Sequence, residues 1–223
     1  MDTMAGAMES SNGDSTGLDL RGLRSNSLAI SDYDQPFNDT LSAIWELPYG
    51  KGRHFGSNAG WPLQMAAGGW QIAAINTMVS GQPVNLVYTP SAAMQVTDTL
   101  SSSSITYNAN VLGNPMLPAD QRTPQQYFNA AMVAAPTDVT HPFGTSGRNS
   151  VRSSPLYQLD LSAQKEFPLP GESRFVQFRA EFFNALNKTN FSPAAGNISN
   201  SSFGTITGTF PARQIQFGLK VIF

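Results

Sequence analysis

The side chains best suited to acid–base or metal chemistry are few in this 223-residue chain. Its two histidines, His54 and His141, have no carboxylate or second histidine at the spacing of a metal site or a catalytic pair. Cysteine is absent, which removes disulfides, thiolate ligands and cysteine nucleophiles together. No serine lies in the Gly-x-Ser-x-Gly elbow of a hydrolase. The sequence therefore predicts no enzyme, no catalytic residue, no metal site and no cofactor.

Phosphate and nucleic-acid binding are also disfavoured. The turn Gly50-Lys51-Gly52 lacks the spacing of a P-loop and its serine or threonine. Charged residues make up 13% of the chain and the net charge is -2, so no basic surface is available to attract nucleic acid. We expect no nucleic-acid partner.

Charged and amide side chains occur instead at alternate positions of apolar segments. The clearest are Asp160, Gln177, Arg179, Glu181 and Lys220. Because successive side chains of a strand point to opposite faces, these residues share a polar face whose reverse side is apolar. In a membrane barrel the polar face lines the lumen, and we predict that position for them. In a soluble sheet the same face would be solvated, and that alternative stays open.

The end of the chain carries the strongest strand pattern. Its alternate positions are apolar, and polar or small residues fill most of the gaps: the apolar set is Ile215, Phe217, Leu219, Val221 and Phe223. Half-buried strands of soluble proteins also alternate, but soluble chains commonly fray at their last residues. A strand of about ten residues crosses a bilayer when it is tilted. This end resembles the closing strand and assembly signal of bacterial outer-membrane barrels, which the barrel assembly machinery recognises.

Four earlier segments also read as strands: 40–48, 69–80, 157–167 and 175–184. The last two alternate in opposite phase about a short turn, so a hairpin puts both apolar sets on one face. We predict that this face contacts lipid through Leu41, Trp45, Leu159, Leu161, Val176, Phe178 and Phe182.

Two irregularities accompany these strands. Segment 69–80 changes phase partway, which suggests either a bulge or a crossing from the membrane to its rim, and 84–88 reads as its continuation beyond the membrane. Lys165 interrupts the apolar set near a strand end, where a lysine can extend to the lipid headgroups.

The remaining residues are polar connections. Residues 1–37 read as a loop or disordered tail, and 38–223 as one barrel segment that contains a long loop over 89–155. With the carboxyl end in the periplasm, the short connections 49–68 and 168–173 fall on that side and the long ones outside. The first residues show no secretory signal.

Several blocks together resemble a known family. They are Leu41 to Arg53, Gly147 to Ser150 ahead of the third strand, Arg179 to Phe191, and Arg213 to Phe217. Their order and spacing over residues 36–223 resemble the carboxy-terminal end of the Oar-like branch of TonB-dependent outer-membrane receptors. The resemblance implies the outer membrane of a Gram-negative-type bacterium and substrate uptake. It also implies a missing amino-terminal barrel and plug, with TonB contacted only through that missing part.

The sequence thus predicts an all-β chain: an antiparallel transmembrane β-barrel segment of about five strands with long extracellular loops. The smallest transmembrane barrels use about eight strands, so we expect the segment to be incomplete as a closed barrel and inactive alone. The expected partners are outer-membrane lipid, the assembly machinery and the missing part of the receptor. The alternative is a soluble secreted β-sandwich that binds a ligand or carbohydrate.

Overall fold

A computed structural model describes residues 29–95, 106–169 and 174–223. The contacts divide the chain into two compact units, which are considered separately. The first contains 1–36, 80–155 and 191–209, and the second contains 37–79, 156–190 and 210–223. Residues 1–28 lie outside the described residues, so the tail predicted over 1–37 stays a prediction there.

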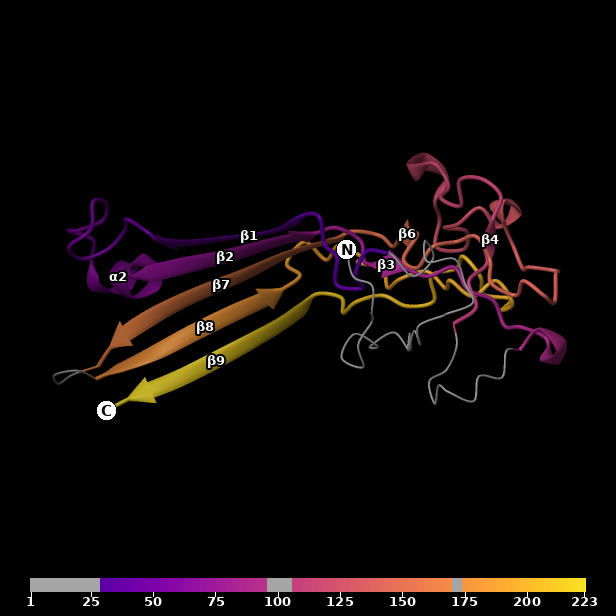
Figure 1. Ribbon diagram of the computed structural model, residues 1–223. Coiled ribbons are helices and arrows are strands. Elements are labelled where there is room, and N and C mark those ends of the chain that lie inside the picture. Colours follow the sequence, from indigo (N-terminus) through magenta and orange to yellow (C-terminus); the bar gives the residue numbers. More distant parts are fainter. Residues whose placement is uncertain (1–28, 96–105, 170–173) are drawn as a thin grey trace. The chain divides into compact units, whose positions relative to one another are not determined.

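The second unit is built on a five-stranded antiparallel sheet with strand order β1-β2-β7-β8-β9 (Figure 1). Its strands are β1 (Asn38–Glu46), β2 (Trp70–Val79), β7 (Leu156–Pro168), β8 (Phe175–Phe183) and β9 (Gln214–Ile222). Each lies within about two residues of a segment that the alternation predicts, which is the usual uncertainty of element ends. Within the described residues the sheet is open, because β1 and β9 each pair with one neighbouring strand. The predicted all-β antiparallel segment, incomplete as a closed barrel, is confirmed.

The phase change in β2 does not mark a bulge. The pairing with β1 runs without interruption from Asn38 opposite Val79 to Glu46 opposite Gln71, and the pairing with β7 is equally continuous. A bulge would place two residues opposite one. The prediction of a bulge is therefore wrong: the backbone alternates regularly, and only the face that carries the apolar side chains changes along the strand.

The connections at the two ends of the sheet differ in length. Residues 47–69 and 169–174 join strands at the end where β9 finishes, whereas 80–155 and 184–213 join them at the other end. The first of these contains helix α2 (Trp61–Ala67), which lies beside the start of β2 (Figure 1). Proline at the beginning of α2 suits a helix start, since its missing N–H would have no partner there.

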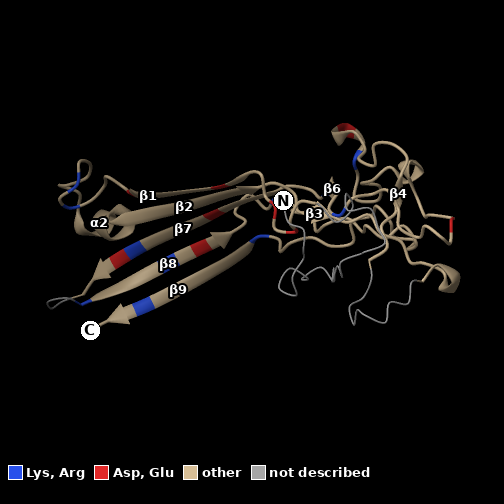
Figure 2. Cartoon of the chain, in the orientation of Figure 1, with Lys and Arg blue, Asp and Glu red and all other residues tan. Residues whose placement is uncertain are grey.

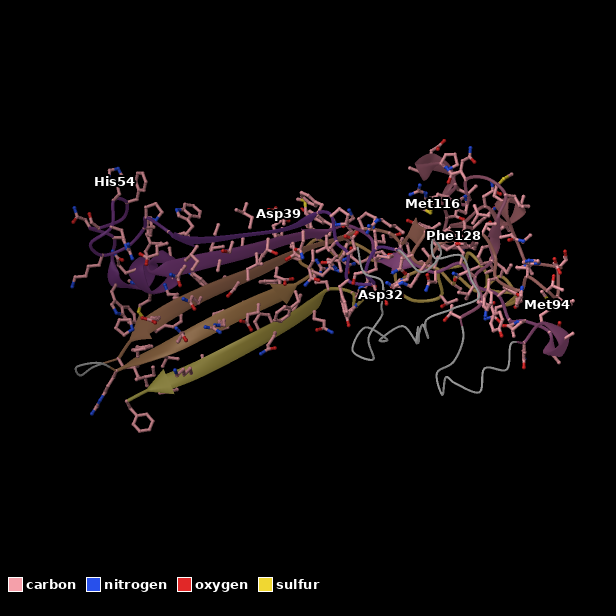
Figure 3. The ribbon with its side chains drawn as sticks, in the orientation of Figure 1. Asp32, Asp39, His54, Met94, Met116 and Phe128 are labelled. Atoms are coloured by element: carbon pink, nitrogen blue, oxygen red, sulfur yellow. The ribbon has the colours of Figure 1, made fainter. Side chains whose placement is uncertain are left out.

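The first unit has an apolar core of its own. Phe128 and Leu86 are completely buried and pack with Tyr127, Val133 and Val151. Phe128 is labelled in Figure 3. Its regular elements are short, as follows: β3 (Pro83–Val84) with β6 (Val151–Arg152), β4 (Asn110–Val111) with β5 (Val133–Ala134), and the 3₁₀ turns η2 (Ala92–Met94), η3 (Ala119–Gln121) and η4 (Ala130–Met132). Residues 84–88 were predicted to continue β2, and this is wrong. Val84 pairs with Val151 in a separate two-stranded sheet.

Candidate functional site: a two-faced sheet

Register determines which side chains share a face of the sheet. Directly opposed residues of antiparallel strands point the same way, and one row crosses all five strands, from Trp45 through Ile72, Ala163 and Ala180 to Phe217. The next row ends in Phe182 and Ile215, and others contain Phe178 with Leu219 and Val176 with Val221.

One face of the sheet therefore carries the seven side chains that the sequence assigns to lipid, together with the four alternate apolar side chains of β9. These are Leu41, Trp45, Leu159, Leu161, Val176, Phe178, Phe182, Ile215, Phe217, Leu219 and Val221. Phe223 follows the end of β9 and is 97% exposed. Two predictions remain for this surface: that lipid covers it, and that the apolar set at the end of the chain acts as an assembly signal.

The apolar face is exposed where a soluble protein would bury it. Leu219 is 70% exposed, and Phe217, Leu41 and Trp45 are similarly open. The other described sheets have two strands each and belong to the other unit. The larger apolar side chains that β7 and β8 place on this face, between the edge strands β1 and β9, are half-buried. An apolar face that is open in this way marks a binding or membrane-facing surface.

The reverse face holds the five side chains predicted to line a lumen: Asp160, Gln177, Arg179, Glu181 and Lys220. The Gln177 amide donates across the strands to Glu166 Oε1 at 3.2 Å, and Lys220 stands opposite Gln177 in the register. Arg179 Nη1 lies 3.4 Å from Glu181 Oε1. Figure 2 shows that acidic and basic positions are interspersed on an otherwise uncharged sheet.

Asp160 has a structural task on that polar face. Its carboxylate accepts hydrogen bonds from the Gln158 amide at 2.9 Å and from the Asn184 backbone N–H at 2.8 Å. Asn184 has a positive φ of 51°, in the left-handed region that asparagine tolerates better than most residues. Asp160 thus stabilises the turn at which the chain leaves β8.

Lys165 does not extend toward the lipid headgroups as expected from the sequence. It stands opposite Trp70 and Phe178 on the apolar face and is 2% exposed. Its ammonium donates to the carbonyl oxygens of Gln64 and Gly68 at the end of α2 and lies 5.6 Å and 5.2 Å from the ring centres of Trp70 and Phe167. A lysine at a helix carboxyl end and over aromatic faces is electrostatically favoured. That expectation is wrong because α2 covers the charge.

The histidines occupy different settings (His54 is labelled in Figure 3). The ring of His54 packs edge-on against Phe55 at 4.6 Å. No carboxylate partner was expected for His141, and this expectation is wrong: its Nδ1 lies 2.9 Å from Asp138 Oδ2. Hydrogen bonds from the Thr140 hydroxyl, from His141 and from the Thr140 backbone N–H lower the pKa of Asp138 to about 2. The group is an exposed turn, and the described residues contain no cluster of three or more metal-ligating side chains.

Polar contacts organise the interior of the first unit. Asn149, at φ 59°, donates from its side-chain amide to Ile30 O at 2.9 Å and to Asp32 Oδ1 at 2.5 Å, and its backbone N–H donates to Asn85 Oδ1. It belongs to the block 147–150 noted in the sequence. These contacts give Asn149 the structural role of fastening residues 30–32 within the unit.

Elsewhere in this unit, burial raises the pKa of Tyr88, whose hydroxyl donates to Pro142 O.

A single antiparallel sheet with one exposed apolar face and one polar face is the construction of a membrane-spanning β-barrel wall. A family model described as an outer membrane beta barrel domain matches residues 1–216. The chain therefore belongs to the outer-membrane β-barrel domain family, and its place is the outer membrane. No curated protein and no solved structure gave a match. None of the helices in the described ranges has the length and apolar character needed to span a bilayer.

Proposed function

We propose that the chain is the carboxy-terminal part of the barrel of a TonB-dependent receptor, which takes up a substrate across the outer membrane of a Gram-negative-type bacterium. The observation that carries the proposal is the sheet with one apolar and one polar face, joined to the sequence blocks that resemble the Oar-like branch. In this proposal the apolar face contacts lipid and the polar face lines the lumen.

The arrangement of the connections supports an orientation. The two shorter connections lie at the end where β9 finishes, and both longer ones lie at the opposite end. Outer-membrane barrels have short periplasmic turns and longer extracellular loops. In this orientation the connections 80–155 and 184–213 are extracellular. The apolar core around Phe128 then belongs to the extracellular part of the protein.

The proposal names partners for each surface. Outer-membrane lipid covers the apolar face, the barrel assembly machinery reads the strand that ends in Phe223, and the plug and preceding strands meet the polar face and the free strand edges. TonB is contacted through the amino-terminal part of the receptor. No catalytic role and no nucleic-acid partner belong to the proposal.

TonB binding is the experiment that separates a receptor from another kind of barrel. The outer-membrane protein that contains residues 1–223 is purified in detergent, and binding of the isolated periplasmic domain of TonB is measured by a titration. Saturable binding supports the receptor. A heat-modifiable, folded barrel that does not bind TonB would refute the receptor role while leaving the family membership untouched.

A further inference from the structure

Helix α2 lies on the apolar side of the sheet. The side chains of Trp70 and Lys165 point to that side, and both bind the carbonyl oxygens at the end of α2: Trp70 Nε1 donates to Ala66 O at 2.9 Å, and the Lys165 ammonium donates to Gln64 O and Gly68 O. The helix is thus held over the face that is assigned to lipid, near the end where β9 finishes.

The exposed surface of α2 is unusual for a helix in water. Its sequence, WPLQMAA, contains no charged residue. Trp61 is 74% exposed and Leu63 is 51% exposed, so the two largest apolar side chains of its first turn point away from the protein. A helix surface that presents tryptophan and leucine outward suits a membrane interface better than water.

The only polar side chain of α2 is already satisfied within the protein. Gln64 Oε1 accepts from the Lys51 backbone N–H at 2.8 Å, and its amide donates to Gly56 O at 2.6 Å. No side chain caps the helix start at Gly60. Pro62 has no backbone N–H, and the backbone N–H groups of Leu63 and Gln64 both donate to Gly60 O at 3.1 Å. The start of α2 therefore brings few backbone donors without a protein partner to a bilayer interface.

The chain's three tryptophans gather at this end of the sheet. Trp45 and Trp70 lie near the ends of β1 and β2, and Trp61 begins α2. Tryptophan is enriched at membrane–water interfaces because its ring is apolar and its N–H is polar. The presence of all three tryptophans at one end of the sheet therefore places the bilayer boundary at the level of α2.

We propose that α2 is an interfacial anchor whose Trp61 and Leu63 side chains insert among phospholipids at the periplasmic boundary of the membrane, and that Lys165 is the positioning residue that holds α2 there. The inference rests on the proposed assignment of the apolar face to lipid, with which the surface of α2 is continuous. By binding the carbonyl groups, Lys165 both fastens the helix and keeps its own charge out of the lipid.

Site-directed fluorescence tests the anchor, because the chain has no cysteine of its own. Leu63→Cys, Lys51→Cys and Leu219→Cys are introduced singly into the protein that contains residues 1–223, labelled with an environment-sensitive fluorophore and reconstituted into phospholipid vesicles. A preparation without an introduced cysteine sets the background. Quenching is measured with nitroxide phospholipids labelled near the headgroup or deep in the chain, and with aqueous iodide.

We expect the label at position 63 to be quenched more by the shallow than by the deep nitroxide, and its iodide quenching constant to be several-fold below that at position 51. Position 219 should prefer the deep nitroxide. Equal iodide quenching at 63 and 51, with position 219 in lipid, would overturn the anchor alone. Loss of lipid quenching at 219 would overturn the lipid assignment and the anchor with it.

The role of Lys165 is tested in the same preparation. Lys165→Met should release α2, so that the label at position 63 gains iodide accessibility while position 219 is unchanged. Lys165→Arg, which can still donate to both carbonyl groups, should preserve the lipid quenching. Unchanged quenching at position 63 in Lys165→Met would overturn the positioning role.

Discussion

An arginine at Leu219 should damage membrane folding far more than an arginine on the reverse face of the same strand. Leu219 lies close to the middle of β9, is 70% exposed and points to the apolar side. Arginine on the lipid face near the bilayer midplane costs about 2 to 4 kcal/mol. Since about 1.4 kcal/mol is a factor of ten, the folding equilibrium should fall by about 30-fold to 700-fold.

The structure supplies two matched controls on β9. Gln216→Arg places the same side chain opposite Glu181 on the polar face, where a cross-strand pair of opposite charge is stabilising by up to about 1 kcal/mol. Gly218→Arg places an arginine opposite Arg179, and this contact between like charges should be destabilising by up to about 1 kcal/mol. We expect Leu219→Arg to be the most damaging of the three.

Equilibrium folding into vesicles, followed by the heat-dependent shift in electrophoretic mobility, measures the difference. The protein that contains residues 1–223 is titrated with urea in the presence of lipid, and each variant is compared with the parent. Equal losses for Leu219→Arg and Gln216→Arg would refute the assignment of the two faces.

Three further predictions address other parts of the molecule. If the chain is part of a receptor as proposed, deletion of Phe223 should lower the outer-membrane yield of the protein that contains it without changing ligand affinity, and a changed affinity at normal yield would contradict the assembly role. Phe128→Ala should destabilise the first unit by about 3 to 5 kcal/mol, whereas the exposed Leu112→Ala should change it by less than about 0.5 kcal/mol; thermal unfolding and limited proteolysis compare them. The Asp138 carboxyl should titrate near pH 2 in an NMR titration, below the ordinary 3.8. Because its folded pKa is lowered, its stabilising contribution is present above pH 3.8 and is lost as the pH falls through 2. Thr140→Val should raise that midpoint.

The strands were predictable because alternation is a local property of the sequence. In β7, β8 and β9 nearly every second residue is apolar. The pairing register of these strands follows from this pattern, because only one register places the apolar side chains of neighbouring strands on the same face of the sheet. The central strand β2 was harder. Ile75 points to the polar face while Ile72 points to the apolar one, and only the pairing on both sides shows that no bulge intervenes.

Contacts between distant residues were beyond the sequence pattern. Lys165 binds Gln64 and Gly68 about a hundred residues away, and nothing near Lys165 in the chain indicates this. The core around Phe128 draws Val151 and Ala194 from separate stretches that read as polar loop, and Leu86 from a segment that read as the continuation of a strand. The pairing of Asp138 with His141 is local and could have been noticed, since the two residues are three apart.

A cysteine scan along β9 tests the central claim most directly. Each residue from 214 to 222 is replaced singly in the protein that contains this chain, and every label is compared for quenching by nitroxide lipid and by aqueous iodide in vesicles. The account predicts a period of two, with positions 215, 217, 219 and 221 quenched by lipid and positions 216, 218 and 220 shielded from it. Uniform iodide quenching along the strand, without alternation, would contradict it.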